Sequence, residues 1–354
     1  LIGGLAGDAL TNADYNVALG YNSLTADTLG SRTIAIGYAA LQKQNFTSAT
    51  DSYNVAVGHA AGGEVTTGVQ NTLIGGLAGD AITTGANNVA LGQAALGTNT
   101  TGSRSTAIGT GALAAHNVTD SSNTYNTAVG HTAGTSVTTG TQNTLIGGLA
   151  GDAITTGSLN TALGYNSLGA NTTASHVTAV GNAALTANTT GTRNTAVGSE
   201  AADAINTGQD NTAIGSLALS ADTKGNYSTA IGRGALKLQN FTSSTSAHNT
   251  AVGYSAGESV TTGVNNTLIG ALAGDAITTG DNNVVLGMSA LTANTTGAQN
   301  VAIGSAALEV STTASDNTAV GFKSLNKNTT GANNVAIGKS AMLDNTTGGL
   351  NTAV

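Results

Sequence analysis

A short motif, Asn-Thr/Val-Ala-Val/Ile/Leu-Gly in its commonest form, recurs along the whole 354-residue chain. We call the glycine that closes each copy the anchor glycine and count positions from it, so that position −1 precedes it and position +4 follows it by four residues. The anchors are Gly3, Gly20, Gly37, Gly58, Gly75, Gly92, Gly109, Gly130, Gly147, Gly164, Gly181, Gly198, Gly215, Gly232, Gly253, Gly270, Gly287, Gly304, Gly321 and Gly338. Of the 19 intervals between them, 16 are 17 residues long and three are 21 residues long. Such a constant register is typical of a repeat architecture in which each copy, or rung, stacks on the next.

Each rung is expected to form one coil of a β-solenoid. The residues before the anchor are rich in Val, Ile and Thr and alternate with period two, as in a strand. A second short strand should follow the anchor, and then a turn of the Asn-Thr-Thr-Gly kind, whose Gly at position +10 suggests a positive φ. Frequent Gly and β-branched residues argue against a helix. The sequence therefore predicts an all-β, parallel β-solenoid of about 20 coils, forming a rod of about 95 Å at about 4.8 Å per coil.

Composition agrees with this architecture and excludes several others. The chain has 50 Gly and no Pro, and Pro cannot donate to a ladder in which nearly every strand is central. It has no Cys, which excludes disulfides and thiolate zinc sites. Ten Lys and Arg against 18 Asp and Glu argue against a nucleic-acid partner, and no apolar run is long enough to insert into a membrane. Residues 1–354 are expected to form one continuous domain, a fragment of a longer fibre because the chain starts and stops inside a motif.

Residue columns indicate how the coil is filled. Asn dominates position −4 and would form a hydrogen-bonded ladder between stacked rungs. Positions −3 and −1 share one strand face and are expected to fill the coil, which turns position −2 outward. That position is always apolar. An apolar outer stripe should be buried against another copy of the chain, although a stripe made mostly of Ala could also stay solvated in a monomer. The interface between chains is therefore expected at Leu73, Leu145, Leu268 and Ala302.

The three 21-residue rungs carry four extra residues with related sequences. Insertions in solenoids map to loops, which are often the binding side. Candidate contacts with a receptor or glycan are Asn45, Phe46, Asn117, Asn240 and Phe241. The alternative is that the insertion widens the coil locally and each Phe is buried as a plug.

Position +1 carries a set of rings that would align on the outer surface, where they could stack on sugar rings or form a solvated face: Tyr21, Tyr38, His59, His131, Tyr165, Tyr254 and Phe322. Asp8, Asp80, Asp152 and Asp275 stand alone in GLAGDA sequences, and a turn-capping role is favoured over calcium binding because the nine-residue period of calcium repeats is absent. No spacing of Ser, His and Asp resembles a catalytic arrangement. We expect no catalytic, cofactor or metal site.

The NTAVG and NVAIG strands, each followed by a small residue, resemble the head repeats of trimeric autotransporter adhesins of the YadA type. They are equally similar to the repeat shafts of phage tail-fibre proteins, in which NTAIG-YxAL-xxNTTG arrays are common. The resemblance covers all 20 anchors, although a 17-residue period is longer than that of the adhesin head. It implies a left-handed β-roll, assembled as a homotrimer and exposed on a cell or virion surface for attachment.

Two functions are therefore considered. The first is a structural fibre or adhesin segment, extracellular, whose partners are copies of itself and a surface glycan or receptor; repeated weak contacts would give it avidity. The second is an ice-binding solenoid, because Thr recurs in the turns and in position −3. Val17, Ile34, Val55, Val89 and Val301 interrupt the Thr column in the strands, which weakens the second hypothesis.

Overall fold

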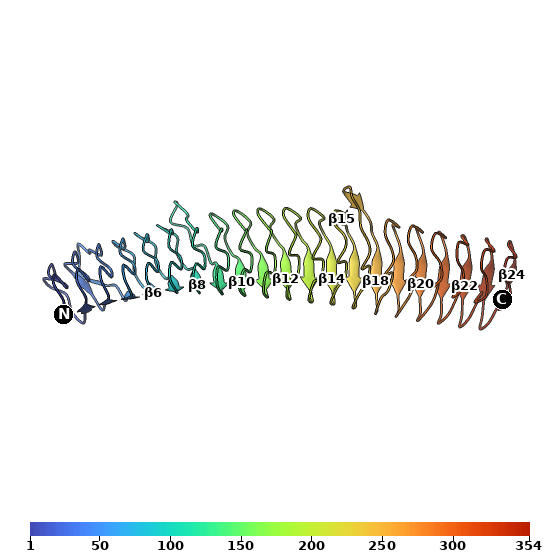
Figure 1. The fold of residues 1–354 in the computed structure, drawn as a ribbon, viewed down its shortest axis with the longest axis horizontal. Helices are drawn as coiled ribbons and strands as arrows, with labels where there is room; N and C mark the ends of the chain where they lie inside the picture. Colours follow the sequence, from blue (N-terminus) through green and yellow to red (C-terminus); the bar gives the residue numbers. More distant parts are fainter. The chain divides into compact units, whose positions relative to one another are not determined.

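A computed structural model describes residues 1–354, and every regular element in it is a β-strand. Contacts within the chain divide it into two units, Leu1–His176 and Val177–Val354. In Figure 1 the first unit runs from blue to green and the second from green to red, and within each unit one coil follows the next. The expectation of a single continuous domain stays a prediction.

The first unit is a stack of parallel strands, one before each anchor glycine from Gly20 to Gly164. They are β1 (Val17–Leu19), β3 (Ile34–Ile36), β5 (Val55–Val57), β6 (Thr72–Ile74), β7 (Val89–Leu91), β8 (Thr106–Ile108), β9 (Thr127–Val129), β10 (Thr144–Ile146) and β11 (Thr161–Leu163). Each pairs in register with the next, as where Leu73 of β6 lies opposite Ala90 of β7. The first long rung adds a two-stranded sheet, β2 (Gly30–Ser31) with β4 (Thr50–Asp51). The predicted parallel β-solenoid is confirmed.

The second unit repeats this arrangement. Its stacked strands are β12 (Thr178–Val180), β13 (Thr195–Val197), β14 (Thr212–Ile214), β16 (Thr229–Ile231), β18 (Thr250–Val252), β19 (Thr267–Ile269), β20 (Val284–Leu286), β21 (Val301–Ile303), β22 (Thr318–Val320), β23 (Val335–Ile337) and β24 (Thr352–Ala353). The long rung adds β15 (Gly225–Asn226) paired with β17 (Thr245–Ser246). In Figure 1 the chain around β15 stands out beyond its neighbours, as does the teal loop near β8.

Turns follow directly after each anchor, so the second strand expected there is absent. Positions −5, +2 and +4 adopt positive φ, as at Asn87, Ala94 and Leu96. The anchor itself needs glycine, because a Cβ on Gly92 (φ +135°) would lie 2.6 Å from the carbonyl carbon of Gly109. The glycines at position +10 do not have positive φ, contrary to expectation; instead a Cβ on Gly85 would lie 2.5 Å from the carbonyl oxygen of Gly102. Close stacking of rungs, rather than a positive φ, favours glycine there, although Ala13, Ala174 and Ala314 occupy this position in three rungs.

The strand faces are oriented opposite to the expectation. Position −2 points into the coil, and Leu73, Leu145, Leu268 and Ala302 are all fully buried. They cannot form an interface between chains, and that prediction was wrong. Positions −3 and −1 point outward, as the exposed–buried–exposed pattern of β1 shows. The physical reason is that the interior of the coil is narrow. Where position +4 supplies a Leu from the opposite side, the strand can place only one small side chain, that of position −2, inside.

The coil interior is filled in two alternative ways. In twelve rungs position +4 is Leu or Met and position +7 is polar, as in Leu96 with Asn99, whose amide bonds both the N–H and the carbonyl of Gly102. In the other eight rungs position +4 is Gly or Ala, and position +7 supplies an aliphatic side chain instead. These pairs are Gly7–Leu10, Gly62–Val65, Gly79–Ile82, Gly134–Val137, Gly151–Ile154, Ala202–Ile205, Gly257–Val260 and Gly274–Ile277. Close packing requires that one site or the other fill the space.

The Asn column at position −4 forms the expected ladder. The backbone N–H of Asn71 donates to Oδ1 of Asn54 (2.9 Å), and the N–H of Asn88 donates to Oδ1 of Asn71 (3.0 Å). The Nδ2 group of Asn71 donates to the carbonyl of Gly85 (2.9 Å), so both ends of this buried amide are satisfied. Each Asn thus bonds the turn of its own rung through Nδ2 and the backbone of the following rung through Oδ1.

Candidate functional site

The outward side of the stacked strands is one candidate surface; we call it the strand face, made of the side chains at positions −3 and −1. Position −1 is Val, Ile or Leu at every anchor that a strand precedes. In the first unit Leu91 and Leu163 are 43% and 45% exposed, and in the second Leu286 is 45% exposed. Position −3 is mostly Thr, with six consecutive Thr from Thr178 to Thr267. Each unit therefore presents an aliphatic column beside a Thr-rich one.

The ring column at position +1 is partly assembled as expected. The rings of Tyr21 and Tyr38 stack with centroids 5.8 Å apart, and those of Tyr38 and His59 with centroids 5.3 Å apart. His131, Tyr165, Tyr254 and Phe322 are exposed on single rungs. Because both faces of Tyr38 are covered by neighbouring rings, the stack offers less ring surface than separate rings would. Sugar stacking on this column stays a prediction.

Sequence reasoning missed a second ladder of exposed side chains at position −5. Arg32 lies over the rings of Tyr15 and Tyr53, 4.9 Å and 5.8 Å from their centroids, and pairs with Asp51 at 3.0 Å. Arg193 bonds Asp210 through two nitrogens (2.6 and 2.9 Å), which raises the pKa of Arg193 and lowers that of Asp210. Tyr227 and His248 stack at 5.2 Å. When the rungs are aligned on the anchors, these partners fall in one column, and Asp51 falls beside it. This alignment could have predicted the ladder from the sequence.

The long rungs hold their Phe residues inside rather than presenting them. Phe46 and Phe241 are only 5% and 6% exposed, so the alternative of a buried plug is correct and the expected contact through these rings is wrong. Asn45, Asn117 and Asn240 accept hydrogen bonds from the hydroxyls of Thr28, Thr100 and Thr223, one rung earlier. These three Asn side chains fasten each insertion to its neighbour. Whether they also contact a receptor stays a prediction.

Beneath the first insertion lies a buried polar network. The Nε2 group of Gln44 donates to Oδ2 of Asp27 (2.7 Å), and Oε1 of Gln44 accepts from Nδ2 of Asn54 (2.8 Å). Oδ1 of Asp27 accepts from the N–H groups of Gly30 and Phe46. The third long rung repeats this arrangement with Asp222 and Gln239. Both networks stabilise the turn under the insertion.

The middle long rung replaces this network with a buried histidine. Nε2 of His116 lies 3.5 Å from Nδ2 of Asn126, while Nδ1 has no partner. Burial lowers the pKa of His116 to about 4, opposed by a backbone contact with Thr138, so the ring is neutral at pH 7.

The aspartates of the GLAGDA sequences lie in turns at position +5. Burial raises the pKa of Asp80, Asp152 and Asp275, while backbone N–H groups of the same turns, such as those of Asp80 and Ala81, act in the opposite direction. Asp203, outside any GLAGDA sequence, shares this column and this shift. No three His, Asp or Glu side chains lie together as a metal site would require. Oδ1 of Asp152, Asp203 and Asp275 is buried without a hydrogen-bond partner, so the turn-capping role stays a prediction.

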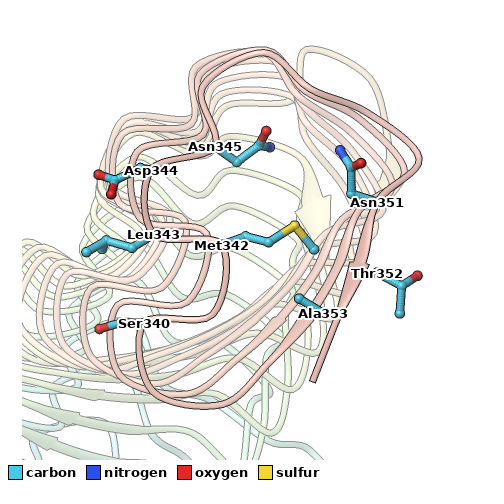
Figure 2. A pocket seen from close by; sticks show the side chains of 8 residues that line it. All are labelled: Ser340, Met342, Leu343, Asp344, Asn345, Asn351, Thr352 and Ala353. Carbon is cyan, nitrogen blue, oxygen red and sulfur yellow. The ribbon is translucent and has the colours of Figure 1, made fainter.

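A pocket lies at the last rung, lined by residues between Ser340 and Ala353. Figure 2 shows Met342 pointing into the coil between Asn345 and Asn351, while Asp344 and Thr352 point away from it. Met342 and Asn345 occupy the same columns as Leu325 and Asn328 of the preceding rung. The pocket is a cross-section of the coil interior and not a separate site.

Comparison with models of protein families and with curated proteins finds no match to this chain. The structure also contains no helix of the length and apolarity needed to cross a membrane.

Proposed function

We propose that this chain is a segment of an extracellular attachment fibre, displayed on a cell or virion surface and assembled from three copies through the strand face. The observation that carries the proposal is the outward aliphatic column at position −1, which continues from rung to rung within each unit. Contiguous apolar surface of this kind marks an interaction site on a soluble protein. Each buried Å² of it contributes about 25 cal/mol.

A second copy of the chain is the partner that fits this face best. It presents the same aliphatic column with the same spacing between rungs, so one contact repeats at every level of the stack. Small strand side chains, mostly Ala, lie inward, and the outward Val, Ile and Thr leave a regular surface without long polar chains. The resemblance to YadA-type heads and phage tail-fibre shafts supports the homotrimer and the surface location. A glycan or receptor bound along such a fibre would be held by avidity.

Light scattering on the purified chain tests the assembly. We expect three times the chain mass of 34.2 kDa. The double variant Leu91→Glu/Leu163→Glu places charges on the strand face and should give a folded chain of single mass. The matched control Thr67→Glu/Thr156→Glu places the same charges on exposed turns and should keep the trimer mass. A single-chain mass for the unmodified protein, or a trimer that survives both face charges, would overturn the proposal.

The outward Thr column favours ice binding as the second candidate. In the second unit it runs unbroken over six rungs from Thr178 to Thr267, on the same face as the aliphatic column. In the turns, by contrast, the hydroxyls of Thr66 and Thr83 donate to carbonyls one rung later. A thermal hysteresis that grows with protein concentration would support this candidate, and its absence would exclude it.

A further inference from the structure

The three long rungs share one backbone plan but differ at their surface. A pocket of about 230 Å³ opens in the middle one, lined by Val118, Thr119, Asp120 and Ser122 of the insertion and by Thr139 and Thr141 of the next rung. We propose that this pocket binds one neutral sugar unit. The inference rests on the attachment role proposed above, for which it names the ligand class.

Comparison with the other two insertions shows what opens the pocket. Val118 stands where the first and third long rungs have Phe46 and Phe241, and all three side chains pack against the turn glycine one rung earlier, with a Cβ there 2.8–2.9 Å away. Val118 is as well covered as Phe46 and Phe241, at 6% against 5% and 6% exposed, but its smaller side chain fills less space. The three long rungs therefore place an apolar side chain at the same point of the backbone. In the middle rung that side chain is the smallest.

The rim of the pocket also differs in its polarity. Asp120 replaces Ser48 and Ser243, and Thr141 replaces Val69 and Val264. The N–H of Ser122 donates to Oδ1 of Asp120 (3.1 Å), and the Ser122 contacts hold the pKa of Asp120 below its usual range, so this carboxylate is charged at pH 7. The hydroxyls of Thr119, Thr139 and Thr141 have no hydrogen-bond partner within the chain. The middle rung thus combines an apolar floor with an acceptor and three free hydroxyls.

This chemistry matches a sugar better than other ligands. A carboxylate accepts hydrogen bonds from adjacent hydroxyl groups, and charged acceptors make the stronger ones. Val118 lines the pocket but is only 6% exposed, so the C–H face of a ring would contact it over a small area. An anion would be repelled by Asp120 in a chain of net charge −8, and calcium needs six to eight oxygen ligands where one carboxylate is present. The volume lies below the roughly 300–1,000 Å³ of pockets for larger ligands, which suits a single ring.

Saturation-transfer NMR on the full chain tests the site, with the methyl glycosides of glucose, galactose, mannose and N-acetylglucosamine as probes. We expect transfer to at least one of them. Oligosaccharides that end in the same sugar distinguish two sources of the ligand, the terminus of a glycan and a free monosaccharide. Tighter binding of the oligosaccharide than of the methyl glycoside identifies a glycan terminus. Transfer to none of the four would overturn the proposal, as would displacement of the bound probe by calcium alone.

Variants taken from the sister rungs locate the binding. Val118→Phe and Asp120→Ser introduce the residues that already fold at equivalent positions, and each should weaken binding at least tenfold. Thr47→Ala in the first long rung is the matched control and should leave binding unchanged. Unchanged binding in Val118→Phe would overturn the site. Because Val118→Phe should keep the oligomeric mass of the parent chain, failure of this site and failure of fibre assembly are separate results.

Discussion

Leu73 occupies the interior space that Gly79 leaves empty: a Cβ placed on Gly79 would lie 2.7 Å from Cδ2 of Leu73. The same Cβ would lie 2.9 Å from Cδ1 of Ile82. In the next rung Leu96 fills this space, and Ala90 and Asn99 stand where Leu73 and Ile82 stood. The interior of the coil is therefore one volume that the sequence fills from alternative sides.

This relationship predicts that Gly79→Leu is destabilising although Leu is accepted at the same position elsewhere. The positive φ is not the obstacle, since Leu96 has φ 54° and Gly79 has φ 56°. The added side chain would overpack the coil and cost about 1–3 kcal/mol in the free energy of unfolding. Adding Leu73→Ala and Ile82→Asn should recover most of it in urea titrations. A triple variant no more stable than Gly79→Leu would contradict the two modes of filling.

The Asn ladder predicts a large cost for Asn88→Ala. This side chain is fully buried, accepts from the N–H of Ser105 (3.0 Å) and donates to the carbonyl of Gly102 (3.0 Å). Truncation leaves the buried N–H of Ser105 unpaired, at about 1–3 kcal/mol, whereas the carbonyl of Gly102 keeps the hydrogen bond from Nδ2 of Asn99. Gln93→Ala on the exposed surface is the control and should change the free energy of unfolding by less than about 0.5 kcal/mol. Equal stability of the two variants would contradict a structural role for the ladder.

The corrected strand orientation predicts different effects for two nearby leucines. Leu145 is fully buried at position −2, and Leu145→Ala should cost about 2–5 kcal/mol through the cavity it leaves. Leu163 at position −1 is 45% exposed, and Leu163→Ala should cost much less in a monomeric fold. Urea unfolding of Leu145→Ala and Leu163→Ala is compared in the Leu91→Glu background, where assembly should be weakened. The free energies of unfolding then report packing within the coil and not packing between chains. A larger loss for Leu163→Ala than for Leu145→Ala would favour the assignment expected from the sequence, with position −1 inside the coil and position −2 outside.

The buried histidine predicts an acid-sensitive middle rung. The pKa of His116 is about 4 in the folded chain against 6.5 for a free histidine, so its contribution to stability is full above pH 6.5 and is lost as pH falls toward 4. The loss approaches about 3 kcal/mol at pH 4. His116→Gln, which copies Gln44 and Gln239, should remove this component when unfolding of the two proteins is compared at pH 7 and pH 4.5.

The same comparison controls for the turn aspartates. Burial raises the pKa of Asp80 and Asp152, so the folded chain binds their protons first and gains stability as pH falls, opposite to His116. Both proteins share these groups, so their effect cancels in the difference. An identical pH dependence in the parent chain and His116→Gln would show that the ring is not buried as described.

Several features of the fold could be predicted from the sequence because they depend on spacing alone. The 17-residue period places like residues above like, so strand position, parallel register and the ladder from Asn54 to Asn71 and Asn88 followed from the anchors. The candidate sites were predicted less well. The alignment of Tyr21, Tyr38 and His59 was expected, whereas the ladder around Arg32 and the pocket beside Val118 were not.

Which side of each strand faces inward was decided by the tertiary structure. A three-residue strand such as Thr72–Ile74 has apolar side chains on both faces, so alternation alone is compatible with either orientation. The choice depends on the volume left by the turn on the opposite side of the coil. That volume is set by position +4, which is Leu or Gly in most rungs, and by position +7, which is aliphatic where position +4 is small. Likewise, Phe46 and Phe241 are buried because each packs against a turn glycine of the preceding rung, Gly30 or Gly225, a contact that the linear sequence does not display. Sequence by itself determined the period and the columns; packing across the narrow interior determined which columns remain available to a partner.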